Sequence, residues 1–121
     1  MNILKISHND SLIVHIDSSE ELIFDEQSAL DLFATIRYDE NSDRIIINKA
    51  NLSENFFDLK TGIAGAILQK VMNYQFKIAI IGDFSIYSSK GLNDFIYETN
   101  KGKSIFFLNS KNEAIKKLSS F

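Results

Sequence analysis

Two hydrophobic periods alternate along this chain, and together they predict strands interleaved with helices. Short apolar runs rich in β-branched residues and bounded by polar turns are typical of strands. Such runs lie at residues 2–7, 11–17, 44–49, 76–82 and 104–108. The second run is apolar almost throughout, as expected for a strand covered on both faces. The short polar connection His8-Asn9-Asp10 predicts a β-hairpin between the first two runs.

Apolar residues at helical spacing fill the intervals after the second run. They predict helices over residues 25–38, 62–74, 88–100 and 110–118. Ser88 or Ser89 and Ser110 are suitable N-caps, and Gly102 ends the third helix. The segment from Ala50 to Lys60 has no clean period.

Small residues cluster at the start of the helix predicted over residues 62–74. They are Gly62, Ala64, Gly65 and Ala66. A helix with such small side chains can approach a sheet closely, so we expect tight packing there. We expect Ile63, Ala66, Ile67 and Val71 to face inward.

The resulting order β-β-α-β-α-β-α-β-α predicts one α/β domain over residues 1–121. Alternating strands and helices favour a mainly parallel, five-stranded sheet with helical cover and right-handed crossovers. The first strand is expected to be an antiparallel edge strand.

Composition removes several classes of function. The chain has no cysteine, which excludes disulfides and thiolate metal sites. Its two histidines, His8 and His15, lack metal-ligand spacing, so we predict no metal and no cofactor. The net charge of -3, with scattered basic residues, argues against nucleic-acid binding. No signal peptide and no membrane-spanning run is evident, and we expect a cytoplasmic protein.

Fold logic gives a location for a ligand or partner. In open α/β sheets, ligands usually meet the crevice beyond the carboxyl ends of the strands. Residues 48–62, 83–90 and 109–112 converge at that end of the predicted sheet. The candidate binding or switch residues are Asn48, Lys49, Asp58, Lys60, Thr61, Gly62, Asp83, Phe84 and Tyr87.

The most distinctive of these positions is the helix start at Thr61-Gly62. Free backbone N–H groups and the positive end of a helix dipole favour a small anionic ligand or a phosphate on Thr61, and Lys60 adds charge. The same residues also suit a structural role, with Thr61 as a cap and Asp58 closing a turn. Asp83 has the same two interpretations, because an acid after a strand binds a ligand or caps a loop.

Aromatic residues are frequent in the second half of the chain. Most are expected in the core. Phe56, Phe84 and Tyr87 fall in predicted loops, where they would either rim a pocket or partner surface or join the core.

Several segments together resemble the bacterial domain-of-unknown-function family 4180 over nearly the whole chain. They are Ala29-Leu30-Asp31-Leu32, Ile46-Ile47-Asn48-Lys49, Phe56-Phe57-Asp58-Leu59-Lys60-Thr61-Gly62 with Ala64-Gly65, Leu68-Gln69-Lys70, Ala79-Ile80-Ile81-Gly82-Asp83-Phe84, and Asp94-Phe95-Ile96-Tyr97-Glu98 with Asn100-Lys101-Gly102. This resemblance implies no activity.

The element order also resembles that of STAS domains, which act as anti-sigma-factor antagonists. Those domains carry an Asp-Ser-Ser-Gly-type segment at the start of the helix after the third strand, and the serine before the glycine is phosphorylated. Thr61-Gly62 lies at that place. Here Asp58 is one residue further from the glycine, and Lys60 replaces a small hydroxyl residue.

These observations leave three hypotheses open. The first is a non-catalytic, STAS-like interaction or regulatory module that acts through residues 48–62 and 83–90. The second is a small-molecule-binding protein or enzyme that uses the same crevice. No convincing catalytic set appears, so the first is preferred. The third is a homodimer built on an edge strand or a helix face.

Overall fold

The computed structural model describes residues 2–121 and contains one five-stranded sheet with four α-helices. The strands are β1 (Asn2–His8), β2 (Ser11–Asp17), β3 (Arg44–Asn48), β4 (Lys77–Ile81) and β5 (Ile105–Leu108). The helices are α1 (Glu26–Glu40), α2 (Ile63–Asn73), α3 (Lys90–Asn100) and α4 (Lys111–Leu118). β1 is antiparallel to β2 and the remaining pairs are parallel, which confirms the predicted fold class.

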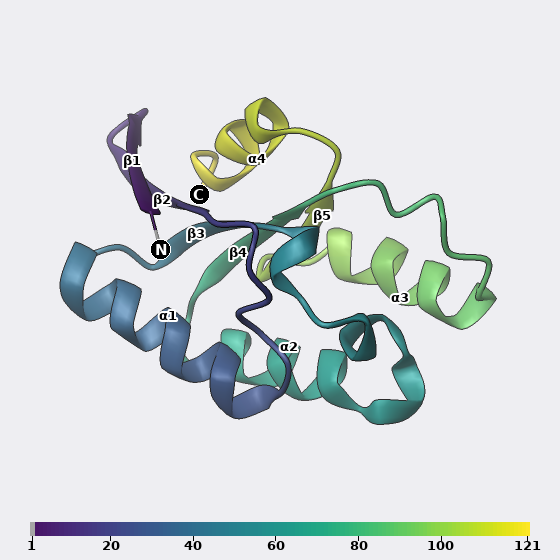
Figure 1. Cartoon of the computed structure of the whole chain (residues 1–121). Helices are drawn as coiled ribbons and strands as arrows, with labels where there is room; N and C mark the ends of the chain where they lie inside the picture. The colour runs from purple at the N-terminus through teal and green to yellow at the C-terminus, as the bar shows by residue number, and fades with distance from the viewer. Residues whose placement is uncertain (1) are drawn as a thin grey trace.

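Strand order decides how the helices are layered. The sheet order is β1-β2-β3-β4-β5, so every crossover steps in the same direction. Right-handed crossovers that all step one way place their helices on one face. α1, α2 and α3 accordingly lie beneath the sheet, whereas α4 follows the last strand and covers the opposite face (Figure 1).

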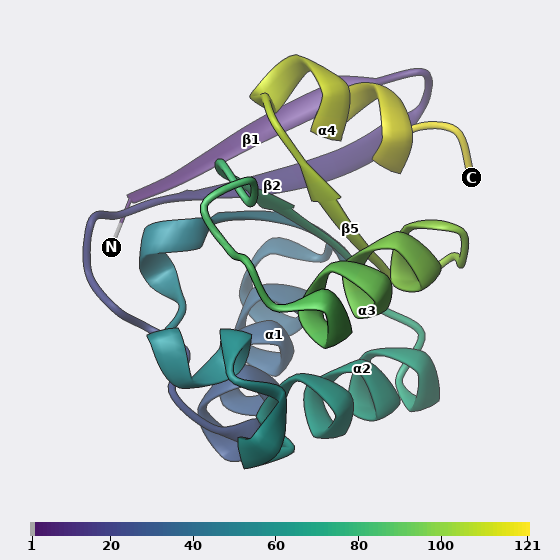
Figure 2. The ribbon, with the colours of Figure 1, turned by 90° about the vertical axis from the view of Figure 1, so that its right-hand side faces the viewer.

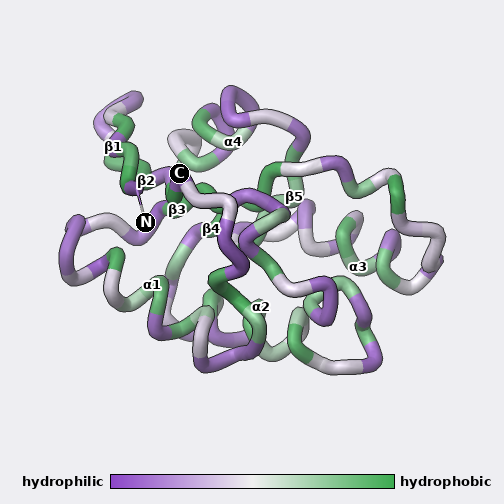
Figure 3. The backbone as a smooth tube through the Cα atoms, in the orientation of Figure 1, coloured by the Kyte–Doolittle hydropathy of each residue, from purple (hydrophilic) through white to green (hydrophobic). Residues whose placement is uncertain are grey.

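Two hydrophobic cores result from this layering. The larger lies between the sheet and α1 to α3, and it includes Val14, Ile47, Ile67 and Phe107. The smaller lies under α4. The side of α4 that faces the sheet is hydrophobic, and its outer side is hydrophilic (Figure 3). None of the helices in residues 2–121 combines the length and apolar character needed to cross a lipid bilayer.

The predicted hairpin between β1 and β2 is present, but its turn has two residues, because His8 belongs to β1 and leaves Asn9 and Asp10 as the connection. Asn9 and Asp10 both have positive φ, at 49° and 64°. This conformation defines a type I′ turn, which Asn and Asp tolerate better than most residues. The turn closes on the pair His8 and Ser11.

The segment without a clean period forms three short 3-10 turns. They are η1 (Lys49–Asn51), η2 (Glu54–Phe57) and η3 (Leu59–Thr61). Side chains at their starts hold them locally, because Ser53 accepts from the Asn55 N–H and Asp58 accepts from the Lys60 N–H. These turns form the edge of the molecule below the N-terminal hairpin in Figure 2.

The expected close approach at the start of α2 is wrong for Gly62 and Gly65. A Cβ at either position would meet nothing within 4 Å, and both residues are exposed. The buried face is instead Ala64, Ile67 and Val71, and Ala66 is only half-buried. The reason is the helical period: Ala64, Ile67 and Val71 share one side of α2, which begins after its N-cap Gly62, and Gly65 lies on the opposite side of the helix.

Candidate functional site

Five side chains from two loops meet at the carboxyl ends of β3 and β4. We call Lys49, Glu54, Phe57, Phe84 and Tyr87 the carboxyl-end cluster. The Lys49 Nζ lies 3.3 Å from the Glu54 Oε1, and the Tyr87 hydroxyl donates to the Glu54 Oε2 at 3.0 Å. The Phe57 ring stacks on Tyr87 with centroids 5.0 Å apart and lies 6.0 Å from Phe84. The two loops are therefore fixed against each other.

Gly82 directs Lys49 into this cluster. A Cβ on Gly82 would lie 2.6 Å from the Lys49 Cβ, so the lysine stem occupies the space that only glycine leaves. The Lys49 side chain is 18% exposed, and its ammonium group lies 5.1 Å from the Tyr87 ring and 5.4 Å from the Phe57 ring. Such an arrangement holds a cation by ring electrostatics as well as by the carboxylate.

The electrostatics of the cluster follow from these contacts. Burial raises the pKa of Tyr87 above its ordinary value. The pKa of Lys49 is raised, mainly by its interaction with the Tyr87 hydroxyl and in the same direction by Glu54. The nearby Asp83 has a lowered pKa because the Ser85 hydroxyl and N–H donate to it, at 2.6 Å and 3.0 Å. Asp83 therefore caps its own loop.

Alkaline conditions are expected to weaken the fold through this cluster. Above the ordinary Tyr87 pKa of 10.0, the unfolded chain loses the phenolic proton while the folded chain keeps it, so stability falls as the pH rises. Lys49 acts in the same direction, because its pKa in the folded chain is raised above the ordinary value of 10.5. The stability that this shift contributes is fully present below pH 10.5 and is lost as the pH rises through the pKa of the folded chain. Tyr87→Phe should lose less of its free energy of unfolding than wild type between about pH 9 and about pH 11, as measured by urea unfolding. Tyr38→Phe, at a side chain that is 90% exposed, should leave it unchanged.

Asn48 points to the other face of the sheet. Its Oδ1 lies 3.2 Å from the Nε2 of His15, and both side chains share the face that α4 covers. His15 is buried, and its Nδ1 has no hydrogen-bond partner among residues 2–121. Asn48 is therefore separated from its sequence neighbour Lys49 by the thickness of the sheet.

The helix start at Thr61 is exposed, but most of its hydrogen-bonding groups are already used. The Thr61 hydroxyl contacts the backbone oxygens of Asn55 and Asp58, both at 2.8 Å, and accepts from the Ile63 N–H at 3.2 Å. The Thr61 and Gly62 N–H groups donate to residues 58 and 59. The hydroxyl thus holds the turn before α2 rather than standing free in solvent.

The predicted site residues consequently lie in three places. Lys49, Phe84 and Tyr87 belong to the carboxyl-end cluster, with Asp83 beside it. Asn48 lies on the α4 face with His15. A third group, Asp58, Lys60, Thr61 and Gly62, forms the exposed turn before α2.

Burial also decides between the two alternatives for Phe56, and the structure adds two residues to the site. Phe56 is not a rim residue, because it is 1% exposed and packs in the core. Sequence reasoning missed Glu54, which links Lys49 to Tyr87, and the fully buried Asn51. The capping signal Asn48-x-x-Asn51 was available locally. The Glu54 contact spans 33 positions and had no local signal.

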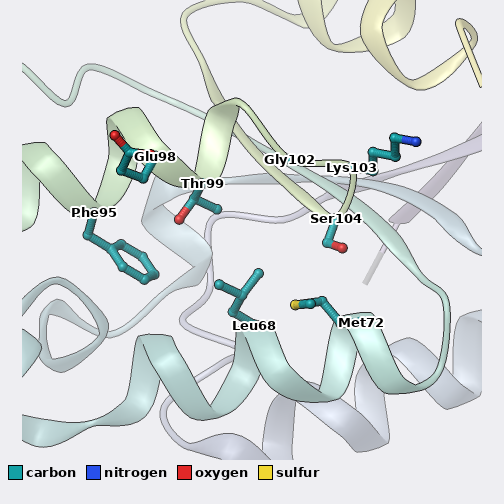
Figure 4. Close-up of a pocket in the computed structure, with 8 residues that line it drawn as sticks. All are labelled: Leu68, Met72, Phe95, Glu98, Thr99, Gly102, Lys103 and Ser104. Atoms are coloured by element: carbon teal, nitrogen blue, oxygen red, sulfur yellow. The ribbon is translucent and has the colours of Figure 1, made fainter.

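The main hollows on the surface of residues 2–121 are lined by other residues. A hollow of about 350 Å³ lies between α2 and α3. Its apolar floor is formed by Leu68, Met72 and Phe95, with the hydroxyls of Thr99 and Ser104 on its wall (Figure 4). A groove of about 500 Å³ runs beside α1 over Phe76. The predicted site residues line neither.

Fold and site together define a small α/β domain with sequential strand order and a closed aromatic and charged cluster at one sheet edge. Within residues 2–121, no group of three or more His, Asp or Glu side chains is placed to hold a metal ion. A family model described as a domain of unknown function, DUF4180, matches residues 8–118, and the chain belongs to that family. Comparison with curated proteins and with solved structures gives no match.

Proposed function

We propose that this chain is a non-catalytic interaction module that binds a protein partner through the loops over residues 48–62 and 83–90. Its STAS-like element order supports such a role by analogy of fold. The loops carry the carboxyl-end cluster, which fixes their backbones relative to the sheet. A loop held on a rigid scaffold presents its outer side chains in one geometry, which is what specific recognition needs.

The observation that carries this proposal is the filling of the space between the loops. The Phe57, Phe84 and Tyr87 rings pack there, on top of Phe107. A sequential sheet also has no reversal of strand order, which is where ligand crevices of open sheets form. The surface left for a partner is therefore the outer side of the loops, where Ile86 is 63% exposed.

A small-molecule site or enzyme at the same edge has less support. Convergent polar groups around one hollow would be expected of such a site. The polar candidates instead lie in three separate places, and Lys49 is already paired with Glu54. The interaction module is therefore the better account of this edge.

Regulation through Thr61 is part of the proposal. The residue is exposed, and its hydroxyl contacts two backbone oxygens. A phosphate on that oxygen would remove the donated proton and place negative charge beside those carbonyls. The turn before α2 would then rearrange, while the helix itself keeps its packing through Ile67 and Val71.

Affinity capture with tagged variants tests the proposal. Ile86→Asp and Thr61→Asp should each lower the capture of a partner from cell lysate at least about tenfold, which corresponds to about 1.4 kcal/mol. Thr61→Ser keeps the hydroxyl and should behave as wild type. Tyr38→Asp, on α1, is the matched surface control. Circular dichroism should be unchanged in all four, and equal capture by every variant would contradict the proposal.

A further inference from the structure

The hollow between α2 and α3 contains a buried hydroxyl group that the fold does not use. Thr99 is only 9% exposed, and its hydroxyl points into the hollow, toward Phe95 (Figure 4). The Thr99 Oγ1 makes no hydrogen bond with any atom of residues 2–121. A buried hydroxyl without a partner is unfavourable, so such a group in a folded protein requires an explanation.

A threonine on a helix ordinarily has a local partner for its hydroxyl. The group can donate to the backbone oxygen three or four positions earlier in the helix. Thr99 lies in the last turn of α3 and does not use such an acceptor, because its Oγ1 is turned into the hollow instead. The hydroxyl therefore does not hold the helix, and it is available to a molecule in the hollow.

The rest of the lining has the composition of a small-molecule site. The volume of about 350 Å³ is at the lower end of the range for ligand pockets. Leu68, Met72 and Phe95 form an apolar floor, and Met72 is 53% exposed in the free chain. The half-buried Ser104 adds a second hydroxyl that has no partner within the described chain. An apolar surface with a few polar groups is typical of ligand sites.

Charge decides the class of ligand. Two charged residues line the hollow, Glu98 and Lys103. The Glu98 carboxylate is paired with the Lys101 ammonium group at 3.6 Å, and the Lys103 side chain is exposed and extends away from the apolar floor (Figure 4). An ionised ligand would therefore lose water against the floor without gaining a counterion there, which is unfavourable.

We infer that this hollow binds a small uncharged molecule with an aromatic body and one hydroxyl or carbonyl group. The aromatic ring would lie on the floor, because the Met72 thioether and the Phe95 ring both favour aromatic contacts. The polar group of the ligand would pair with the Thr99 hydroxyl. The hollow lies at the amino-terminal ends of β4 and β5, whereas the carboxyl-end cluster lies at the other end of the sheet. Such a ligand goes beyond the proposed function and does not depend on it.

Methyl NMR tests the site directly. Met72 is one of two methionines in the chain, so an isotope label on the methionine methyl groups reports on the floor of the hollow. Benzyl alcohol should shift the Met72 methyl resonance to saturation, with a Kd at least about threefold lower than that of toluene, which lacks the hydroxyl. Benzoate and benzylamine should bind more weakly than benzyl alcohol, because each carries a charge.

Variants at Thr99 separate ligand binding from a structural role. Thr99→Val removes the hydroxyl, so benzyl alcohol should then bind no better than toluene. The same variant should be at least as stable as wild type in urea unfolding, because no internal hydrogen bond is lost. Thr99→Ser keeps the hydroxyl and should bind benzyl alcohol as wild type does. Thr35→Val, at an exposed threonine of α1, is the matched control and should leave binding unchanged.

Three results would overturn the inference. They are a Met72 resonance that none of the four compounds shifts to saturation, tighter binding of benzoate or benzylamine than of benzyl alcohol, and unchanged binding of benzyl alcohol to Thr99→Val. Partner capture provides a separate check, because Thr99→Val should leave capture unchanged and Ile86→Asp should leave the titration unchanged. The ligand site and the proposed interaction module can therefore fail independently.

Discussion

Replacing Phe56 by alanine is expected to lower the free energy of unfolding by about 3–5 kcal/mol. The ring is 1% exposed and lies between Phe57 and Phe107, with centroid distances of 5.0 Å and 6.2 Å. Its removal leaves a cavity beneath the carboxyl-end cluster, because β5 and η2 cannot close together without breaking the sheet. Urea unfolding followed by circular dichroism measures the change.

Two controls separate a cavity from a general effect of losing an aromatic ring. Phe56→Leu fills part of the space and should lose clearly less stability than Phe56→Ala. Phe24→Ala removes a ring that is 55% exposed and should change stability by less than about 1 kcal/mol. A Phe56→Ala variant as stable as Phe24→Ala would show that Phe56 lies at the surface.

Replacing Asn51 by aspartate is expected to cost about 3 kcal/mol or more, because it leaves buried groups unpaired. The Asn51 side chain is fully buried and donates to the backbone oxygens of Ser18 and Glu20, at 2.7 Å and 2.8 Å. It also accepts from the Asn48 N–H at 2.9 Å. Aspartate keeps the acceptor but removes both donors, and it sets a buried carboxylate against two carbonyl oxygens.

The same chemical change at the exposed Asn55 is the matched control. Asn55→Asp should change the free energy of unfolding by less than about 0.5 kcal/mol, because its side chain has solvent around it. Thermal and urea unfolding of both variants give the comparison. Near-equal midpoints for the two would mean that Asn51 does not hold the β2–α1 loop against η1, and that the bridge between Ile23 and Leu52 is sufficient.

The two buried residues also connect stability to the proposed function. Asn51 ends the turn that begins with Lys49, and Phe56 lies directly under Phe57. A variant at either position would loosen the loops over residues 48–62 as well as the fold. Loss of partner capture in such variants is therefore expected, but only the surface variants at Ile86 and Thr61 report on recognition itself.

Local patterns predicted most of the secondary structure because their physical causes are local. Runs of β-branched residues, the turn at Asn9-Asp10 and the caps at Ser89 and Ser110 each involve neighbours within a few positions. The errors arose where small residues were taken as a sign of close packing. The start of α2 is one example, because Gly65 lies on the side of the helix opposite the buried Ile67 and Val71.

The sequence by itself determined the element order, and with it the α/β class, the parallel sheet and the antiparallel first strand. Only the tertiary structure decided which candidate residues meet. Lys49 and Asn48 are adjacent in sequence yet lie on opposite faces, because side chains alternate across a strand. Glu54 and Tyr87 are 33 positions apart yet share a hydrogen bond. Such contacts depend on strand order and crossover direction, which no periodicity along the chain encodes.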